Sequence, residues 1–335
     1  MAAPGPGTST PSVVALDWGT SSQRAWLLGQ GGRVLDVRRP DHGLLSITRT
    51  LDSGDSTALA RAYEDVFWRT CGAWLEAHPG IPTLACGMVG SRQGWREAGY
   101  LTVPAALDLA AEDLTVVEHR GGVAHLVPGL RVPSTAQGAP GDVMRGEETQ
   151  VVGVLDVLRD RNEPLTLVLP GTHTKWVSVR DRKVTSFTTS TASELYGLVL
   201  EHGLLGRTAA PEIPDEAAFR QGAATASAAR GALVELFGAR ALVLEGLLEA
   251  SSVPDYVSGV LIGDEVSHLL PRFGDRGRVV LCGVEGLCRR YAGVLSAVGV
   301  DAEVVAEDAT VRGLWKIAVS TGLVARGPSA EEGTG

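Results

Sequence analysis

Two segments of this sequence share one plan: an apolar strand, a turn that contains Gly-Thr, and a second apolar strand. The first, VALDWGTSSQRAWLL, starts at Val14, and the second, LVLPGTHTKWVSV, starts at Leu167. They lie about 150 residues apart in a chain of 335 residues. This spacing predicts an internal repeat, and two related halves facing each other would bring both turns to one cleft.

Hydrophobic periodicity predicts an α/β chain. Strands are expected at 13–17, 24–28 and 33–38, a helix at 56–78, and a strand in TLACGM. Residues 110–141 are weakly patterned and end in the Pro/Gly-rich segment VPSTAQGAPGD, a candidate boundary. The second half predicts helices from near Gly146 and at 193–205, 215–237, 256–270 and 309–325, with strands at RVVLCG and near 303–306.

The first turn combines a carboxylate with hydroxyl groups. Gly19 lets a ligand approach the backbone, and Thr20 and Ser21 supply hydroxyls beside amides that can form an anion nest. Asp17 would repel a bare phosphate but suits one that arrives with Mg²⁺. The turn can hold a metal–phosphate group, and the alternative is a hairpin whose Asp and Ser cap their own backbone.

Two later turns could contact other parts of a nucleotide. PGTHT repeats the pair as Gly171 and Thr172 without the acid, and its His173 could donate to a phosphate or face solvent. After RVVLCG, Gly283 and Gly286 open a helix and would let a flat ligand lie against the backbone. An ordinary strand-to-helix turn is the alternative at this third position.

The segment MRGEETQ carries candidate proton acceptors. Glu147 and Glu148 follow Gly146 at an expected helix start, where acids often only complement the helix dipole. A kinase that phosphorylates a hydroxyl, however, needs a carboxylate to accept the proton.

The segment GSRQGW carries candidate binding residues. Arg92 beside Ser91 suits a carboxylate, and Trp95 could stack on a sugar chain. The alternative is a surface loop with a solvated arginine and a core tryptophan.

The net charge of −9 makes the chain a poor general nucleic-acid binder, so local cations must hold any anionic ligand. Arg24, Arg92, Arg145 and Lys175 are the candidates, although Arg24 could simply alternate on its strand and Lys175 could be a surface residue. Four scattered cysteines form no Cys-x-x-Cys pair, which indicates neither zinc nor a disulfide framework. Without a signal-peptide or membrane-span pattern, the sequence predicts a reduced, cytoplasmic setting.

Taken in order, these elements resemble the sugar-kinase branch of the actin, Hsp70 and hexokinase superfamily, and more closely the 2-dehydro-3-deoxygalactonokinase family. The resemblance covers about 13–325 and rests on ALDWGTSSQRAWLL, GMVGSRQGW, VMRGEETQ, LPGTHTKWV, SGVLIGDEV and CGVEGLCRRY. It implies two related actin-like ATPase (ribonuclease H-like) lobes facing a central nucleotide and substrate cleft. We expect an N-terminal lobe at 13–140, a C-terminal lobe at 141–326, and disordered tails at 1–12 and 327–335.

The resemblance also implies an activity, namely transfer of the ATP γ-phosphoryl group to the C6 hydroxyl of 2-dehydro-3-deoxy-D-galactonate in galactonate catabolism. It implies ATP and Mg²⁺ as cofactors, with the metal engaged through water by Asp17. The implied phosphate-binding residues are Gly19, Thr20, Ser21, Gly171, Thr172 and His173, and those beside the adenosine are Gly283 and Gly286.

Related glycerol- and xylulose-type kinases have Gly-Asp where this chain has Gly146-Glu147, so Glu147 is the expected base and Glu148 its rival. The expected substrate-binding residues are Arg24, Ser91, Arg92, Trp95 and Arg145.

Three other functions stay open. They are a kinase for another sugar or sugar acid such as 2-dehydro-3-deoxygluconate, a sugar-sensing regulator on this fold, and a filament-forming ATP-binding protein. Such regulators usually carry an added DNA-binding helix-turn-helix, whereas this acidic chain enters its first strand at Val13. Neither a nucleic-acid nor a membrane partner is expected, and homo-oligomerisation stays open.

Overall fold

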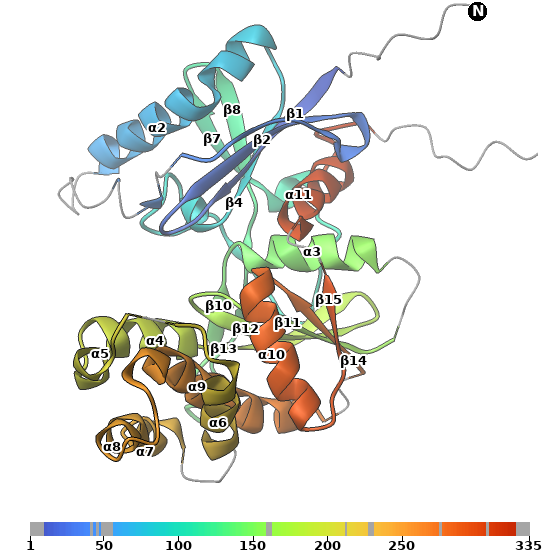
Figure 1. The fold of residues 1–335 in the computed structure, drawn as a ribbon. Coiled ribbons are helices and arrows are strands. Elements are labelled where there is room, and N and C mark those ends of the chain that lie inside the picture. Colours follow the sequence, from blue (N-terminus) through green and yellow to red (C-terminus); the bar gives the residue numbers. More distant parts are fainter. Residues whose placement is uncertain are drawn as a thin grey trace, which may run out of the picture. The chain divides into compact units, whose positions relative to one another are not determined.

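The chain folds into two compact units. The computed structural model describes residues 10–40, 43–44, 47, 56–158, 163–211, 213–226, 231–274, 277–305 and 308–325. Unit 1 comprises Met1–Arg161 and Asp308–Gly335, and unit 2 comprises Asn162–Glu307. The elements of both units are labelled in Figure 1.

Unit 1 contains a six-stranded sheet of order β3-β2-β1-β4-β8-β7. Its strands are β1 (Pro11–Trp18), β2 (Gln23–Gly29), β3 (Val34–Arg38), β4 (Thr83–Cys86), β7 (Thr115–His119) and β8 (Gly122–Leu126). A smaller sheet joins β10 (Asp142–Met144), β9 (Gly129–Val132) and β5 (Tyr100–Thr102), and β6 is Ala105–Ala106. The helices are α2 (Ser56–Ala77), α3 (Glu147–Val157) and α11 (Ala309–Ser320), with short 3-10 helices at Gln30–Gly32, Met88–Gly90 and Ala111–Asp113.

The first strand of unit 1 is buried on both faces. Successive side chains of a strand point to opposite sides of the sheet. Val14, Leu16 and Trp18 pack in the core that α2 covers, and α2 uses the helix face that its periodicity predicted. Val13 and Ala15 pack in the core that α11 covers. The burial on both faces fixes the position of β1 in unit 1, and therefore the position of Asp17 near the carboxyl end of the strand.

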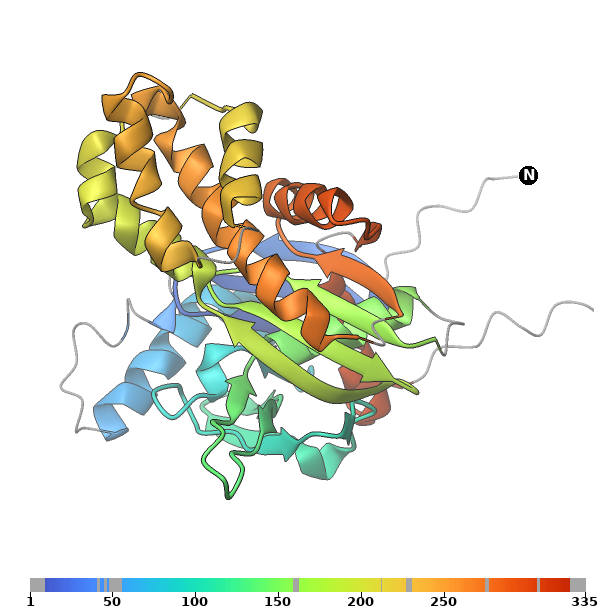
Figure 2. The same ribbon diagram turned by 90° about the horizontal axis from the view of Figure 1, so that it is seen from below.

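Unit 2 contains β11 (Leu165–Leu169), β12 (Thr174–Arg180), β13 (Lys183–Ser190), β14 (Arg278–Cys282) and β15 (Ala302–Val305), in the order β15-β14-β11-β12-β13. Its helices are α4 (Ala192–Glu201), α5 (Leu204–Thr208), α6 (Glu216–Ala226), α7 (Ala232–Glu235), α8 (Gly238–Leu244), α9 (Val253–Leu269) and α10 (Glu285–Ala297), with 3-10 helices at Ala250–Ser252 and Leu270–Arg272. Figure 2 shows α9 crossing the strands with α6 beside it. Residues of α9, α10 and the sheet share one core.

The two units repeat one strand plan. β1 and β11 each pair antiparallel with the next strand, and that strand pairs antiparallel with a third. β1 and β11 also each pair in parallel with a later strand, β4 or β14. The predicted internal repeat and the α/β class with two related lobes are therefore confirmed.

The boundary between the units differs from the expected one at residue 140. α3 and α11 both belong to unit 1, because they pack at very short range. A Cβ atom on Gly153 would lie 1.8 Å from the carbonyl oxygen of Ala309, and one on Gly313 would lie 1.9 Å from that of Thr149. These glycines let the two helices touch, so residues 141–161 and the C-terminal helix extend unit 1 rather than unit 2.

Several local expectations are also corrected. Pro11 and Ser12 begin β1 instead of ending a tail, while the expected tails at 1–9 and 327–335 lie outside the described residues. Residues 110–141 contain β7, β8 and β9, which are too short to show a strong pattern. The helix expected at 193–205 breaks at Gly203, where a Cβ atom would lie 2.3 Å from the carbonyl oxygen of Val199. The segment expected as one helix at 215–237 holds α6 and α7, with 227–230 outside the described residues.

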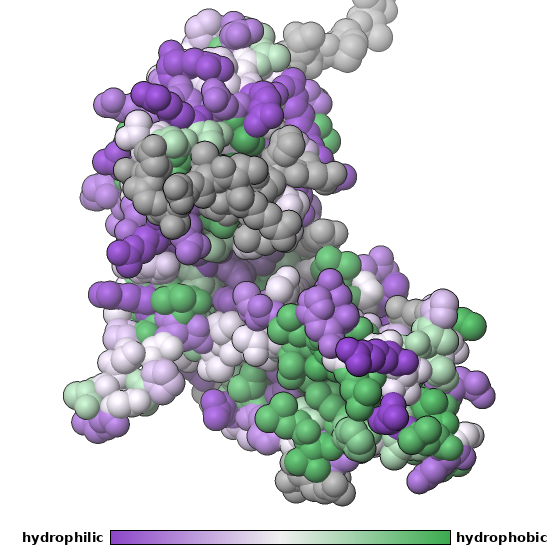
Figure 3. All heavy atoms as spheres, turned by 90° about the vertical axis from the view of Figure 1, so that its left-hand side faces the viewer, coloured by the Kyte–Doolittle hydropathy of each residue, from purple (hydrophilic) through white to green (hydrophobic). Residues whose placement is uncertain are grey.

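Part of the surface of unit 2 is apolar. Figure 3 shows apolar side chains gathered over its small helices. The exposed large apolar residues of α4, α5, α7, α8 and the following loop are Leu198, Leu204, Leu233, Val234, Leu244 and Leu247, together with Phe237. Among the described residues, no helix has the length and apolar character needed to cross a membrane.

Candidate active site

The first Gly-Thr turn connects β1 to β2 in unit 1. The Gly19 amide donates to the Ser22 carbonyl oxygen at 3.0 Å and closes the turn. Thr20 and Ser21 are exposed, which leaves both side chains accessible to a ligand. Gly43 packs against the backbone of this turn, since a Cβ atom there would lie 2.3 Å from the carbonyl carbon of Ser21. The turn is thus supported from one side.

Asp17 is paired with the strand opposite. It lies across from Arg24 in the antiparallel register, and an Nη2 of Arg24 donates to Oδ2 of Asp17 at 2.7 Å. The side chain of Arg24 is 28% exposed, and that of Asp17 is 19% exposed. Arg24 therefore orients the carboxylate of Asp17. Its expected role in holding the substrate stays a prediction.

The carboxyl end of β4 brings a thiol to Asp17. Cys86 lies beside Asp17 in the parallel register, and its Sγ is 3.9 Å from Oδ1 of the acid. Burial raises the pKa of the Cys86 thiol well above its usual value, and the negative charges of Asp17 and Glu148 raise it further. The thiol therefore stays protonated, and its electrostatic coupling shows that Glu148 lies near the same strand end.

Two glycines let the start of α3 pack against the carboxyl end of β4. Gly146 has φ 107°, a conformation that favours glycine, and a Cβ atom on it would lie 3.3 Å from the Cα of Gly87. Gly87 directly follows β4, so Glu147 and Glu148 begin their helix beside the ends of β1 and β4. Unit 1 therefore gathers the predicted carboxylates in one region.

The two glutamates of α3 have different surroundings. Glu148 is 2% exposed, and its carboxyl oxygens accept hydrogen bonds from the Gly146 amide at 2.7 Å and the Thr149 hydroxyl at 3.1 Å. Burial, with the charge of Glu147 as the second cause, raises the pKa of Glu148 to about 8. Glu147 is partly exposed, and its Oε2 accepts from the Arg145 amide at 3.1 Å.

The loop after β4 places its three candidate residues differently. Arg92 is exposed and Ser91 is buried. Trp95 is 8% exposed and packs in the core of unit 1, with ring centroids 5.2 Å from Phe67 and 6.4 Å from Trp18. The structure thus corrects the expectation that Trp95 stacks on a substrate, because its indole is enclosed by other aromatic rings.

The second Gly-Thr turn connects β11 to β12 in unit 2. Thr172 and His173 are exposed, and Nε2 of His173 lies 3.0 Å from Oε2 of Glu194. Lys175 is 4% exposed and its Nζ donates to the His173 carbonyl oxygen at 3.4 Å. Lys175 is thus a buried part of the turn and not a surface residue.

A buried polar network lies behind the second turn. The Thr174 and Tyr291 hydroxyls are 3.1 Å apart, the Tyr291 hydroxyl donates to Oε1 of Glu265 at 2.9 Å, and the Trp176 indole donates to the same oxygen at 2.7 Å. Burial raises the pKa of Glu265. Sequence reasoning assigned no role to this network, although SGVLIGDEV and CGVEGLCRRY, which hold Glu265 and Tyr291, were among the segments that carried the resemblance.

The third turn lies against the second. A Cβ atom on Gly283 would be 2.8 Å from the Pro170 carbonyl oxygen, whereas Gly286 is exposed in the first turn of α10 and, its own neighbours in the helix apart, none of the described residues lies within 4 Å of its Cβ position. The structure therefore brings the Gly171 turn and the start of α10 together, as the predicted phosphate and adenosine positions require.

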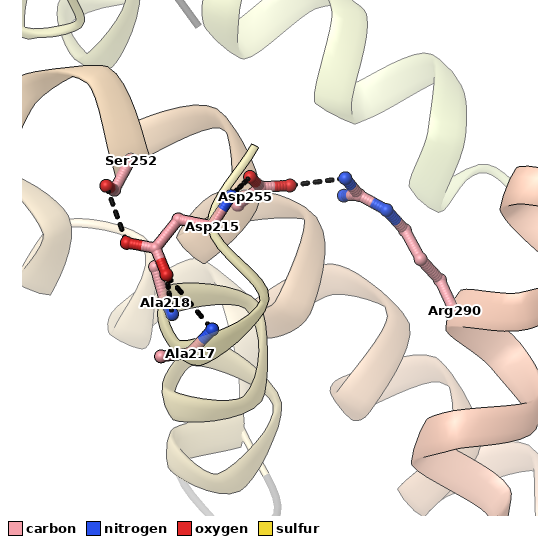
Figure 4. Close-up of polar contacts among 6 residues, drawn as sticks. All are labelled: Asp215, Ala217, Ala218, Ser252, Asp255 and Arg290. Atoms are coloured by element: carbon pink, nitrogen blue, oxygen red, sulfur yellow. Dashed lines mark hydrogen bonds and ion pairs between the residues drawn. The ribbon is translucent and has the colours of Figure 1, made fainter. Parts of the chain in front are cut away.

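The helix α10 is tied to its neighbours by a charged network (Figure 4). Asp255 on α9 accepts from the Asp215 amide at 2.6 Å and pairs with Arg290 on α10. Asp215 in turn caps α6, and hydrogen bonds from the Ala218 amide and the Ser252 hydroxyl lower its pKa. One buried carboxylate thus connects α6, α9 and α10.

Comparison with known proteins identifies the relatives of this chain. Residues 17–317 match the protein family described as 2-keto-3-deoxy-galactonokinase. The chain is 34% identical over 300 residues to 2-dehydro-3-deoxygalactonokinase of Escherichia coli (strain K12), with 89% of this chain and 94% of the relative covered. DgoK1 of Rhizobium meliloti (strain 1021) is 34% identical over 310 residues, with 91% and 95% covered.

A solved structure from Sinorhizobium meliloti, described as a candidate 2-dehydro-3-deoxygalactonokinase, has a TM-score of 0.78. It is 33% identical, and the match covers 91% of this chain and 98% of that one. The repeated strand plan of the two units and these matches define the class, an ATP-dependent kinase that transfers a phosphoryl group to an alcohol. Within this class, the chain belongs to the 2-keto-3-deoxy-galactonokinase family.

Proposed function

We propose that this protein transfers the γ-phosphoryl group of ATP to the C6 hydroxyl of 2-dehydro-3-deoxy-D-galactonate, a step of galactonate catabolism. The family match over residues 17–317 supports the substrate class. The observation that carries the chemistry is the contact of Gly146 with Gly87, which gathers Glu147 and Asp17 at one edge of unit 1.

Glu147 is our choice for the general base. A base must be deprotonated and must reach the hydroxyl that it serves. Glu148 has a pKa of about 8 and is buried, with both carboxyl oxygens in hydrogen bonds, so at neutral pH it is mainly a neutral structural group. Glu147 is partly exposed at the helix start and meets the requirement for access.

In the proposed step, the C6 hydroxyl oxygen attacks the γ-phosphorus and its proton passes to the Glu147 carboxylate. The new O–P bond forms as the bond from the γ-phosphorus to the β–γ bridging oxygen breaks, and ADP leaves. Such transfers depend mainly on positioning and charge stabilisation. We assign the first phosphate turn to Gly19, Thr20 and Ser21, the second to Gly171, Thr172 and His173, and the adenosine contact to Gly283 and Gly286.

The residues of the first turn fit a magnesium ion that keeps most of its water and phosphate ligands. Asp17 offers a carboxylate that is 19% exposed and held in place by Arg24, and the exposed hydroxyls of Thr20 and Ser21 are beside it in the chain. Mg²⁺ typically takes one or two carboxylates together with substrate phosphates. When bound, it would neutralise phosphate charge, and Asp17 would hold it through water.

The substrate would be held by the loop after β4 and the turn before α3, which carry Ser91, Arg92 and Arg145. The cytoplasm is our proposed location, and it is compatible with four buried cysteines that form no disulfide among the described residues. Homo-oligomerisation was left open by the sequence, and the exposed apolar side chains of the small helices of unit 2 favour it, because such patches often mark interfaces.

The first test is ADP release by purified protein with Mg-ATP and one of three acceptor conditions. We expect strong release with 2-dehydro-3-deoxygalactonate, weaker release with its gluconate epimer, and little without acceptor. A preference for the epimer would keep the kinase but change the substrate. ADP release that is equally strong with and without an acceptor would support a filament-forming ATPase. No ADP release under any condition would support a binding protein.

The second test asks whether Glu147 is the general base. Glu147→Gln should lower turnover by roughly 10²–10⁴-fold, the usual contribution of a positioned proton acceptor. Glu76→Gln, an exposed change on α2, is the matched control. Near-normal turnover in folded Glu147→Gln protein would exclude Glu147 as the base.

A further inference from the structure

Arg145 is a buried cation between β10 and α3. It is 9% exposed, and its Nη2 donates to the carbonyl oxygens of Ala98 at 2.8 Å and Gly99 at 3.3 Å. Its guanidinium carbon lies 4.3 Å from the ring centre of Tyr100. The Nε and Nη1 atoms are buried, and neither has a hydrogen-bond partner in the part of the chain that the structure describes.

A second buried polar atom without a partner lies in the neighbouring loop. Ser91 is 8% exposed, and among the described residues its Oγ has no hydrogen-bond partner. Gly90, directly before it, touches the guanidinium, because a Cβ atom on Gly90 would lie 3.0 Å from Nη1 of Arg145. The loop after β4 and the unpartnered side of Arg145 therefore meet at one place in unit 1.

Within the part of the chain that the structure describes, this buried positive charge has no counterion. An arginine side chain stays protonated, and a buried charge that is neither paired nor fully hydrogen-bonded is strongly unfavourable. Two half-buried arginines have acidic partners, since Arg24 pairs with Asp17 and Arg290 pairs with Asp255. For Arg145, by contrast, the described residues provide carbonyl oxygens and an aromatic ring but no carboxylate. An anion would supply both the missing negative charge and the missing hydrogen-bond acceptors.

We propose that Arg145 and Ser91 bind the carboxylate group of the acceptor and make the enzyme select an acid over a neutral sugar. The inference rests on the proposed function and deepens it. A carboxylate would pair with the guanidinium and accept from the Ser91 hydroxyl, which supplies partners for both buried groups. Arg145 is also two residues before Glu147, so the anchor for one end of the acceptor and the proposed base share one turn.

The test compares two acceptors that differ only in charge. One is 2-dehydro-3-deoxygalactonate, and the other is the same chain with its carboxylate reduced to a hydroxymethyl group. Wild-type protein should strongly prefer the acid. Arg145→Met, which keeps length and removes charge, should lower kcat/KM for the acid by about 10²–10³-fold and for the neutral acceptor by less than about threefold, so the preference collapses.

Two further variants and a control sharpen the result. Arg145→Lys keeps the charge and should retain part of the preference for the acid. Ser91→Ala removes one hydrogen bond and should lower kcat/KM for the acid by about 5–10-fold. Arg96→Met changes an exposed arginine of the same segment and should leave the ratio of the two acceptors unchanged.

Calorimetric binding of the acid without ATP distinguishes this inference from the proposed function. If wild-type protein binds the acid and Arg145→Met does not, yet no ADP is released, the kinase assignment fails and the carboxylate site stands. Equal losses for both acceptors in Arg145→Met would show a structural residue and overturn the inference. The same conclusion follows if this variant binds the acid as wild type does, or if wild-type protein binds no acid.

Discussion

The substitution Glu148→Gln should change how the stability of unit 1 depends on pH. Burial raises the pKa of Glu148 to about 8 in the folded protein, whereas the pKa of an unperturbed glutamate is 4.5. Between these values the folded state binds more protons than the unfolded state, so this group lowers the free energy of unfolding as pH rises. One pKa unit corresponds to about 1.4 kcal/mol, and the window of 3.5 units (8 minus 4.5) therefore to about 5 kcal/mol.

Glutamine is neutral throughout this range and removes that dependence. It keeps one carbonyl oxygen for the Gly146 amide but loses an acceptor, which costs about 1 kcal/mol at every pH. Glu148→Gln should therefore be slightly less stable than wild type near pH 4.5 and several kcal/mol more stable near pH 8. The two stability curves should cross.

Urea unfolding at several pH values measures this difference. Tryptophan fluorescence follows the right part of the molecule, because six of the seven tryptophans lie in unit 1 and only Trp176 lies in unit 2. Exposed Glu76→Gln serves as the matched control and should run parallel to wild type. If the stability difference between Glu148→Gln and wild type were the same at pH 5 and pH 8, the argument for a protonated, buried Glu148 would be refuted.

Three further substitutions test the site. Asp17→Asn should lower turnover by roughly 10²–10⁴-fold in the ADP-release assay, and normal turnover would remove Asp17 from the mechanism. Trp95→Ala should cost about 3–5 kcal/mol in urea unfolding, because a buried aromatic side chain is lost. A raised acceptor KM with unchanged stability would instead restore the stacking role of Trp95. Gly283→Ala should raise the KM for ATP, because the new Cβ atom would lie 2.8 Å from the Pro170 carbonyl oxygen. Gly293→Ala is the control, because, its own neighbours in the helix apart, none of the described residues lies within 4 Å of its Cβ position, and equal KM values in both variants would contradict the contact.

Much of the fold could be predicted from the sequence, because it depends on local patterns. The alternating apolar residues of β1 and the periodic face of α2 gave correct elements, and the repeated Gly-Thr turns gave the internal repeat. The short strands β7 to β9 were missed, because a few residues show too little alternation. The boundary between the two units was misplaced for a different reason. It depends on the contacts of Gly153 with α11 and of Gly313 with α3, which join residues far apart in sequence.

Some properties of the candidate site could likewise be predicted from the sequence, and others could not. The sequence by itself determined which residues sit in the turns and that the chain resembles its family, because motif residues and their order are local properties. Only the tertiary structure decided the state of each side chain. It paired Arg24 with Asp17, enclosed Trp95 in the core, buried Glu148 with a raised pKa, and left Arg145 without an acidic partner among the described residues. Burial, pairing and pKa depend on which distant segments pack against a residue, and no spacing along the chain contains that information.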